Sequence, residues 1–296
     1  MTRTITGRTV SEPSGNVIPG ATIEPVGHGP VSSGPDGMFA VDVGTDSSVR
    51  VAGKAAGHVD HENVLLGSPE LATLRLISLA PPFDLEVYRQ IARKAYDDPS
   101  ALRPITRHVV QPRFYLSTTL EDGTTYIPQD EIDRVISLVQ ATFPQATGGV
   151  FNAQSFTTGT EKVNGSSATG IVAIEVRTDA TSNGIPVCGL ANLFSITLQY
   201  GNRPGATCIC DKSHIIQPDT VIHETAHAAG LFHHSGLGVL NPTNPCSARL
   251  SLTGLSDEEK FYAQIIYSRP QGNTDPDIDP LARTSLTTVS GRAMEP

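Results

Sequence analysis

The sequence predicts an α+β fold with two domains. The chain has 296 residues, which is enough for two hydrophobic cores. Residues 1–80 contain short β-branched and apolar runs between turn residues, whereas apolar residues recur at helical spacing beyond residue 81. We therefore expect an all-β domain at 1–80, a linker with a helix at 81–104, an α+β domain at 105–270, and an acidic, proline-containing tail at 271–296.

Six strands are expected in the all-β domain, at 3–10, 21–26, 38–43, 48–53, 58–66 and 72–79. Turn residues such as Pro35, Asp36 and Gly37 separate them. Apolar and polar residues alternate from Phe39 to Val43, as in a strand with one buried face.

Pro81 and Pro82 mark the end of this domain, because consecutive prolines cannot continue a strand ladder. A helix is expected next, at 83–96, stopping before Asp97. The second domain should contain strands at 109–117, 150–157, 170–176 and 195–200 and helices at 128–143, 219–230 and 255–268. Asp219 or Thr220 can cap the helix at 219–230.

The most informative stretch is 223–233, which reads His-Glu-Thr-Ala-His-Ala-Ala-Gly-Leu-Phe-His. On a helix, His223 and His227 lie one turn apart on one face, as zinc requires of its first two nitrogen ligands. Glu224 is a candidate general base. Gly230 allows a left-handed helix end, after which His233 can return as the third ligand. Three histidines leave the fourth zinc position for water, which is typical of a catalytic site.

A bare His-Glu-x-x-His match is often an ordinary amphipathic helix, but the added glycine and third histidine make coincidence unlikely. The full pattern resembles the zinc-binding signature of the metzincin metallopeptidases. The order of elements in the second domain also resembles a metzincin catalytic domain, nearest the matrixins. That resemblance implies a twisted, mostly parallel sheet, an active-site helix and one catalytic zinc held by His223, His227 and His233.

The same resemblance implies a substrate-binding edge strand. In that family, the edge strand bounds the cleft and pairs with an extended peptide. Residues 189–193 (Gly-Leu-Ala-Asn-Leu) resemble the stretch leading into this edge, so Gly189, Leu190 and Ala191 are expected to contact substrate.

Downstream, the family has a turn with a methionine beneath the metal. No methionine occurs between residues 39 and 293, and we expect Leu240 to occupy that position, followed by Pro242. Leucine and methionine have similar volumes, so the apolar floor would be kept. Ser256 and Glu259 form a capping box for the helix at 255–268. The loop at 241–254 would form a pocket wall.

The first domain resembles the carboxypeptidase regulatory-like domain, a transthyretin-like β-sandwich appended to secreted or surface enzymes. The resemblance rests on turn glycines and strand residues, including Gly7, Gly15, Gly20 and Asp36-Gly37. His28, His58 and His61 lie here, and we expect scattered surface histidines rather than zinc ligands, because they lack ligand spacing.

Four cysteines occur between 188 and 246. Cys208 and Cys210 are too close in sequence for an unstrained bond to each other. We favour two disulfides that join them separately to Cys188 and Cys246, in an oxidising compartment, over four reduced thiols.

The formal charge of −9, from 21 Lys plus Arg and 30 Asp plus Glu, argues against a nucleic-acid partner. No apolar run has transmembrane length, and residues 1–8 lack the hydrophobic core of a signal peptide. The protein either stays inside the cell or begins here after an export signal. The domain resemblance and the expected disulfides favour an extracellular or cell-surface location.

In the tail, Asp275, Asp277 and Asp279 stand at alternate positions. Calcium binding is one alternative, but a solvated acidic loop is the expectation, with a flexible end at 281–296.

These observations predict a zinc-dependent endopeptidase, in which Glu224 takes a proton from metal-activated water and a protein or peptide is the substrate. The alternative is a non-catalytic surface-binding or adhesion protein that uses the β-sandwich and carries a degenerate peptidase scaffold. The intact Glu224 argues against that alternative.

Overall fold

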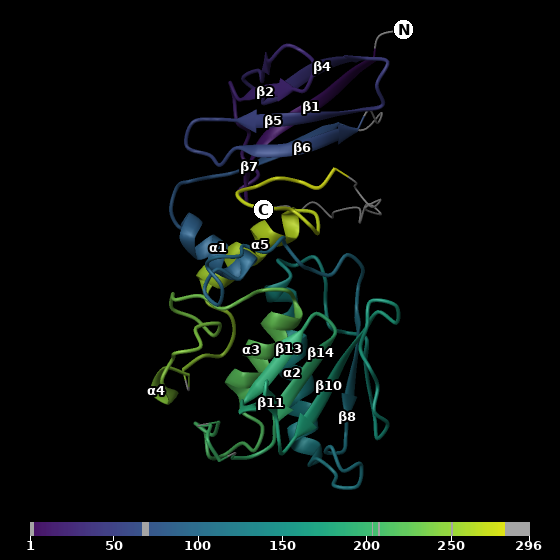
Figure 1. The fold of residues 1–296 in the computed structure, drawn as a ribbon, viewed down its shortest axis with the longest axis vertical. Coiled ribbons are helices and arrows are strands. Elements are labelled where there is room, and N and C mark those ends of the chain that lie inside the picture. Colours follow the sequence, from purple (N-terminus) through teal and green to yellow (C-terminus); the bar gives the residue numbers. More distant parts are fainter. Residues whose placement is uncertain (1–2, 67–70, 203, 207, 250, 282–296) are drawn as a thin grey trace.

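Two facing sheets form the N-terminal sandwich of the computed structural model, which describes residues 3–66, 71–202, 204–206, 208–249 and 251–281 (Figure 1). Their buried residues, such as Phe39, Val51 and Leu74, form one core. All six expected strands are present, and the two-residue β3 was not expected. One sheet has the order β4 (Met38–Gly44), β1 (Arg3–Glu12), β7 (Ala72–Ile77), and the other has the order β3 (Val31–Ser32), β2 (Thr22–Pro25), β5 (Ser48–Lys54), β6 (His61–Leu66).

The second domain is built on a five-stranded, mostly parallel sheet. Its order is β13 (Gly189–Asn192), β14 (Ser195–Gln199), β10 (Ile171–Arg177), β8 (Arg113–Ser117), β9 (Phe156–Gly159). Only β13 runs antiparallel, because a two-residue turn joins it to β14. A small hairpin, β11 (Thr181–Ser182) and β12 (Ile185–Pro186), precedes β13. The strand expected at 109–117 begins only at Arg113, after Pro112, and the one expected at 150–157 begins only at Phe156.

Five helices lie in the described part of the chain: α1 (Leu85–Arg93), α2 (Gln129–Ala146), α3 (Pro218–Ala228), α4 (Cys246–Arg249) and α5 (Asp257–Ser268). The capping box of Ser256 and Glu259 on α5 is confirmed. The expected cap of α3 is wrong, because the helix already begins at Pro218 and leaves Asp219 and Thr220 within its first turn. Proline suits a first helical position, since no N–H is needed there.

The chain after α5 turns back to the sandwich, where it lies between the two domains (Figure 1). The Glu62 N–H of β6 donates to Asp277 O at 3.0 Å, and the Asp279 N–H donates to Glu62 O at 2.9 Å. The prediction of a solvated acidic loop is therefore wrong for Asp277 and Asp279, which are 0 and 3% exposed. Hydrogen bonds allow these two carboxylates to be buried: Asp277 accepts from Arg269 and Asn273, and Asp279 accepts from Asn273.

The histidines of the sandwich differ in burial. His28 is exposed and His58 is half-buried. The expectation of a surface site is wrong for His61, which is buried beside the returning C-terminal segment. Most of the end expected to be flexible, residues 282–296, lies outside the described residues.

One continuous core connects the two domains. It contains the sheet of the second domain, the inner faces of α1, α2, α3 and α5, and Val59 and Ile77 from the sandwich. Helix α3 packs against α2 and against β13 and β14, which places its histidines beside the edge of the sheet.

Candidate metal centre

Three histidine nitrogens converge at the C-terminal part of α3. The Nε2 atoms of His223 and His227 are 2.9 Å apart, and His233 Nε2 lies 3.2 and 3.1 Å from them. Nitrogen ligands at the usual zinc distance of ~2.0–2.1 Å in a tetrahedron lie about 3.3 Å from one another. The three residues thus form a group that can hold a metal ion.

A carbonyl or carboxylate fixes each ring from its other nitrogen. Nδ1 of His223 donates to Val239 O at 2.7 Å, and Nδ1 of His227 donates to Leu231 O at 2.7 Å. Nδ1 of His233 lies 2.9 Å from Asp97 Oδ1. A proton on each Nδ1 leaves each Nε2 with a lone pair, so three lone pairs face one point. Such an arrangement is repulsive by itself, and a cation at the centre relieves it.

His227 is suited to remain neutral. Burial, together with the neighbouring His233, lowers its pKa to about 4. A metal ligand must be the unprotonated imidazole, so this environment favours coordination at neutral pH.

Gly230 permits the return of His233. Its φ is +94°, a conformation that only glycine adopts cheaply. A Cβ atom here would also collide with the carbonyl oxygen of Thr106. Both constraints explain why the expected helix end, Gly230, carries no side chain.

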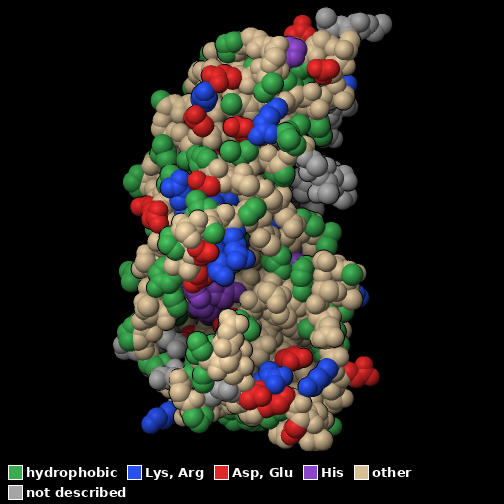
Figure 2. Space-filling view, in the orientation of Figure 1, with side chains coloured by type: hydrophobic (Ala, Val, Ile, Leu, Met, Phe, Trp, Pro, Cys, Tyr) green, Lys and Arg blue, Asp and Glu red, His purple; other side chains and the backbone are tan. Residues whose placement is uncertain are grey.

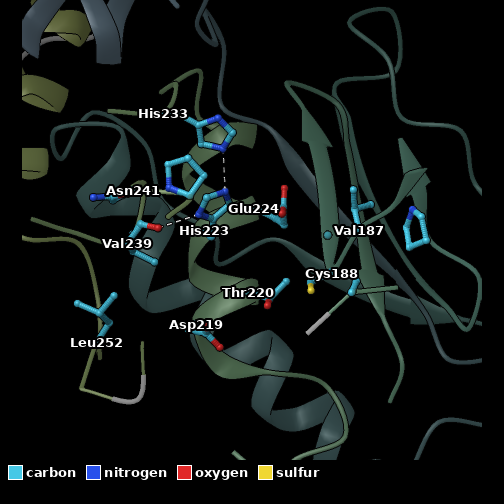
Figure 3. Close-up of a pocket in the computed structure, with 14 residues that line it drawn as sticks. Val187, Cys188, Asp219, Thr220, His223, Glu224, His233, Val239, Asn241 and Leu252 are labelled. Atoms are coloured by element: carbon cyan, nitrogen blue, oxygen red, sulfur yellow. Dashed lines mark hydrogen bonds between the residues drawn. The ribbon is translucent and has the colours of Figure 1, made fainter. Parts of the chain in front are cut away.

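Glu224 faces the strand side of the centre rather than the histidines (Figure 3). Its side chain is 5% exposed, and its Oε2 atom has no hydrogen-bond partner. Burial raises its pKa to about 8. Gly189 of β13 lies directly opposite, where a Cβ atom would collide with the Glu224 carboxylate. The edge strand can approach the carboxylate this closely because Gly189 has no side chain.

The turn at Val239 and Leu240 lies beneath the histidines. Leu240 is fully buried, and its N–H donates to Glu259 Oε1 at 2.7 Å. The same oxygen lies 3.1 Å from Nε2 of His234, whose Nδ1 accepts the Gly236 N–H at 3.0 Å. Because Nδ1 accepts, the proton of a neutral His234 ring is on Nε2, directed at Glu259. The capping residue of α5 therefore also fixes the turn under the metal centre.

Two adjoining cavities flank the centre. One, of about 310 Å³, is lined by His223, Glu224, Gly189 and Pro242 among others. The second, of about 690 Å³, continues along Leu190 and Ala191 past the same histidines. Figure 2 shows histidine side chains gathered in this hollow of the lower domain. All the site residues expected from sequence line these two cavities except Leu240, which is buried and lines neither.

Two disulfides are present, Cys188–Cys208 and Cys210–Cys246, and Cys188 lines the smaller cavity. They are one of the two arrangements that join Cys208 and Cys210 separately to the other two cysteines. The second bond fixes α4 to the loop before α3. Gln217 also braces that loop, because its Oε1 accepts the N–H groups of Cys210 and Asp211. Disulfides of this kind indicate an oxidising compartment.

Sequence reasoning missed Asp97 and the second role of Glu259. Asp97 lies 136 residues before His233, and no periodic pattern connects them. The only available signal was chemical, since a metal-binding histidine usually donates its other N–H to an oxygen. His234, which directly follows the third histidine, is fully buried.

No protein-family model matches this chain, and no curated protein matches its sequence. Among the described residues, no helix is long and apolar enough to span a membrane.

Proposed function

We propose that this protein is a zinc-dependent endopeptidase of the metzincin type. The observation that carries the proposal is the convergence of three oriented imidazole nitrogens beside a buried carboxylate without a hydrogen-bond partner on Oε2, in a hollow bordered by an edge strand. This combination provides a ligand set, a base and a place for an extended substrate.

The residues present fit zinc. Imidazole nitrogens suit this ion, and three of them leave one coordination position for water or substrate. His223, His227 and His233 would hold the ion. When bound, zinc supplies Lewis acidity, which lowers the pKa of water and polarises a peptide carbonyl.

Glu224 would act as the proton carrier. A carboxylate without a partner on Oε2 can accept a proton from water as that water attacks the scissile carbonyl. Burial already raises the pKa of Glu224, which favours holding the proton until the leaving amine takes it. A positive charge nearby lowers this pKa again, so the bound ion and the burial act in opposite directions.

Strand β13 would hold the substrate. It is the edge strand of its sheet and lies against α3. An extended peptide can add to such an edge through main-chain hydrogen bonds, with alternate side chains directed into the flanking cavities. Leu190 is 45% exposed on this strand and offers apolar contact. With the two disulfides, these features favour an extracellular or cell-surface peptidase.

The test is digestion of casein or gelatin by the purified protein, with and without a zinc chelator. Cleavage that chelator abolishes and added zinc restores is expected. Glu224→Ala should remove cleavage while zinc content remains at one equivalent in the catalytic centre. Zinc-loaded protein that binds these substrates without cutting them would favour the adhesion alternative instead.

A further inference from the structure

A second group of metal-binding side chains lies between the sandwich and α5, away from the catalytic hollow. His61 belongs to β6, whereas Asp277 and Asp279 belong to the segment that returns from α5. His61 Nε2 is 3.4 Å from Asp279 Oδ2, and His61 Nδ1 is 4.0 Å from Asp277 Oδ2. All three residues are buried, with at most 3% of each exposed, and their ligand atoms can reach one ion.

The orientation of His61 points to a ligand. Its Nδ1 donates to Arg75 O at 2.7 Å, so a neutral ring carries its lone pair on Nε2. This Nε2 is buried and has no hydrogen-bond partner. A backbone carbonyl orients His61 as carbonyls orient His223 and His227 in the catalytic centre. A separation of 3.4 Å without hydrogen-bond geometry suits two ligands of one ion.

The two carboxylates are fixed in place. Asn273 Nδ2 donates to Asp277 Oδ1 and to Asp279 Oδ1, both at 2.9 Å. Arg269 donates two hydrogen bonds of 2.7 Å to Asp277. A carboxylate oxygen has two lone pairs, so a hydrogen bond does not prevent it from binding a metal.

We propose that His61, Asp277 and Asp279 form a second, structural metal site that joins the two domains. One nitrogen and two oxygen ligands suit zinc or another divalent transition ion better than calcium, which prefers oxygen alone. The burial of all three ligands leaves no path for substrate, so the role is structural. The proposal does not depend on peptidase activity.

The experiment measures zinc content in four proteins after zinc supplementation and dialysis. Two zinc ions per chain are expected in the native protein and one in His223→Ala/His227→Ala. Asp279→Asn should also hold one, because it keeps a side chain of the same shape but loses the anionic ligand. His58→Ala, a histidine of the same domain outside the cluster, should still hold two. Peptidase activity should survive Asp279→Asn.

A native chain with one zinc that Asp279→Asn retains and His223→Ala/His227→Ala loses would overturn this proposal and leave the catalytic centre intact. If the native chain holds one zinc that remains in His223→Ala/His227→Ala and is lost in Asp279→Asn, the second site is supported and the zinc site of the proposed peptidase is overturned. The thermal stability of His223→Ala/His227→Ala provides a second check, in which His61, Asp277 and Asp279 are all unchanged. Zinc should raise its Tm, because a ligand that binds only the folded state stabilises it, and an unchanged Tm counts against the site.

Discussion

The proposed chemistry depends on one carboxylate that is buried but has no hydrogen-bond partner on Oε2. Glu224→Gln keeps the shape of the side chain and removes the base. We expect kcat for peptide hydrolysis to fall on the order of 100- to 10,000-fold, the usual contribution of general-base catalysis, while zinc content stays unchanged. Steady-state kinetics with elemental analysis would measure both. A variant with near-normal kcat would show that another group takes the proton.

Asp97 fixes the third histidine from outside the motif. Asp97→Asn removes the charge that the Nδ1–H of His233 faces. Zinc affinity at the three histidines should fall about 10- to 100-fold, as is typical when the partner of a metal-bound histidine is changed. Competition with a chelator measures the Kd. Asp98→Asn is the matched control, since Asp98 accepts its hydrogen bond from Ser100 instead and should leave the Kd unchanged.

Among the elements, the turn at Val239 and Leu240 tests how far the family resemblance extends. Leu240 is fully buried. Leu240→Met conserves volume and should cost less than ~1.5 kcal/mol of stability. Leu240→Asp would bury a carboxylate among apolar neighbours and should lower both stability and zinc content. Equal tolerance of the two substitutions, measured by thermal unfolding and metal analysis, would remove this turn from the metal centre.

Glu259 of α5, which accepts a hydrogen bond from the turn at Val239 and Leu240, should make the stability of the protein depend on pH in the acid range. Burial raises the pKa of Glu259, but hydrogen bonds from His234, Leu240 N–H and Ser256 N–H outweigh burial and hold the pKa below 4.5. A carboxyl whose folded pKa is depressed contributes stability above its unfolded pKa and loses it as the pH falls through the folded value.

We therefore expect the free energy of unfolding of the parent to drop below about pH 4.5, the ordinary value for glutamate. Glu259→Gln should be less stable at pH 7 and should show a flatter acid dependence. Asp257→Asn, at a fully exposed position of the same helical turn, should leave the profile unchanged. Urea unfolding across pH 3 to 7 provides the data, and identical slopes in parent and Glu259→Gln would contradict the assignment.

At the scale of the whole molecule, a buried ion pair fixes the C-terminal segment to the end of α5, between the two domains. Arg269 and Asp277 are 1 and 0% exposed at their side chains. Arg269→Met leaves Asp277 buried without its partner and should destabilise the chain by roughly 3–5 kcal/mol. Arg50→Met breaks the more exposed pair with Glu62 and should cost less than about 1 kcal/mol. Comparable losses in chemical denaturation would show that burial does not distinguish the pairs.

The features that sequence predicted are those encoded locally. The spacing of His223, His227, Gly230 and His233 lies within a few turns of chain, so helical geometry was enough to bring the ligands together. Residues 189–193 were expected to lead into the edge strand of the cleft, and the structure has the edge strand β13 itself at Gly189–Asn192. Such short-range patterns can be interpreted without knowledge of the rest of the fold.

The features that sequence missed are pairings over long separations. Asp97 meets His233, and His61 meets Asp279, only after the whole chain has folded. The alternation of Asp275, Asp277 and Asp279 resembled a solvated loop because each carboxylate finds its partner on a different element: Arg89 of α1, Arg269 at the end of α5, and His61 of β6. The sequence gives the number and position of charged residues, but their burial depends on the tertiary structure.

The C-terminal segment gives the molecule a second bridge. The chain passes from the sandwich to the lower domain between β7 and α1, and it passes back after α5. A single connection between two domains allows them to rotate relative to each other, whereas two connections at different places prevent that rotation. The sandwich therefore keeps one orientation relative to the hollow that contains the three histidines. A partner bound to the sandwich would therefore lie at a fixed distance from Glu224. If one of the two connections were cut, the other would still join the domains.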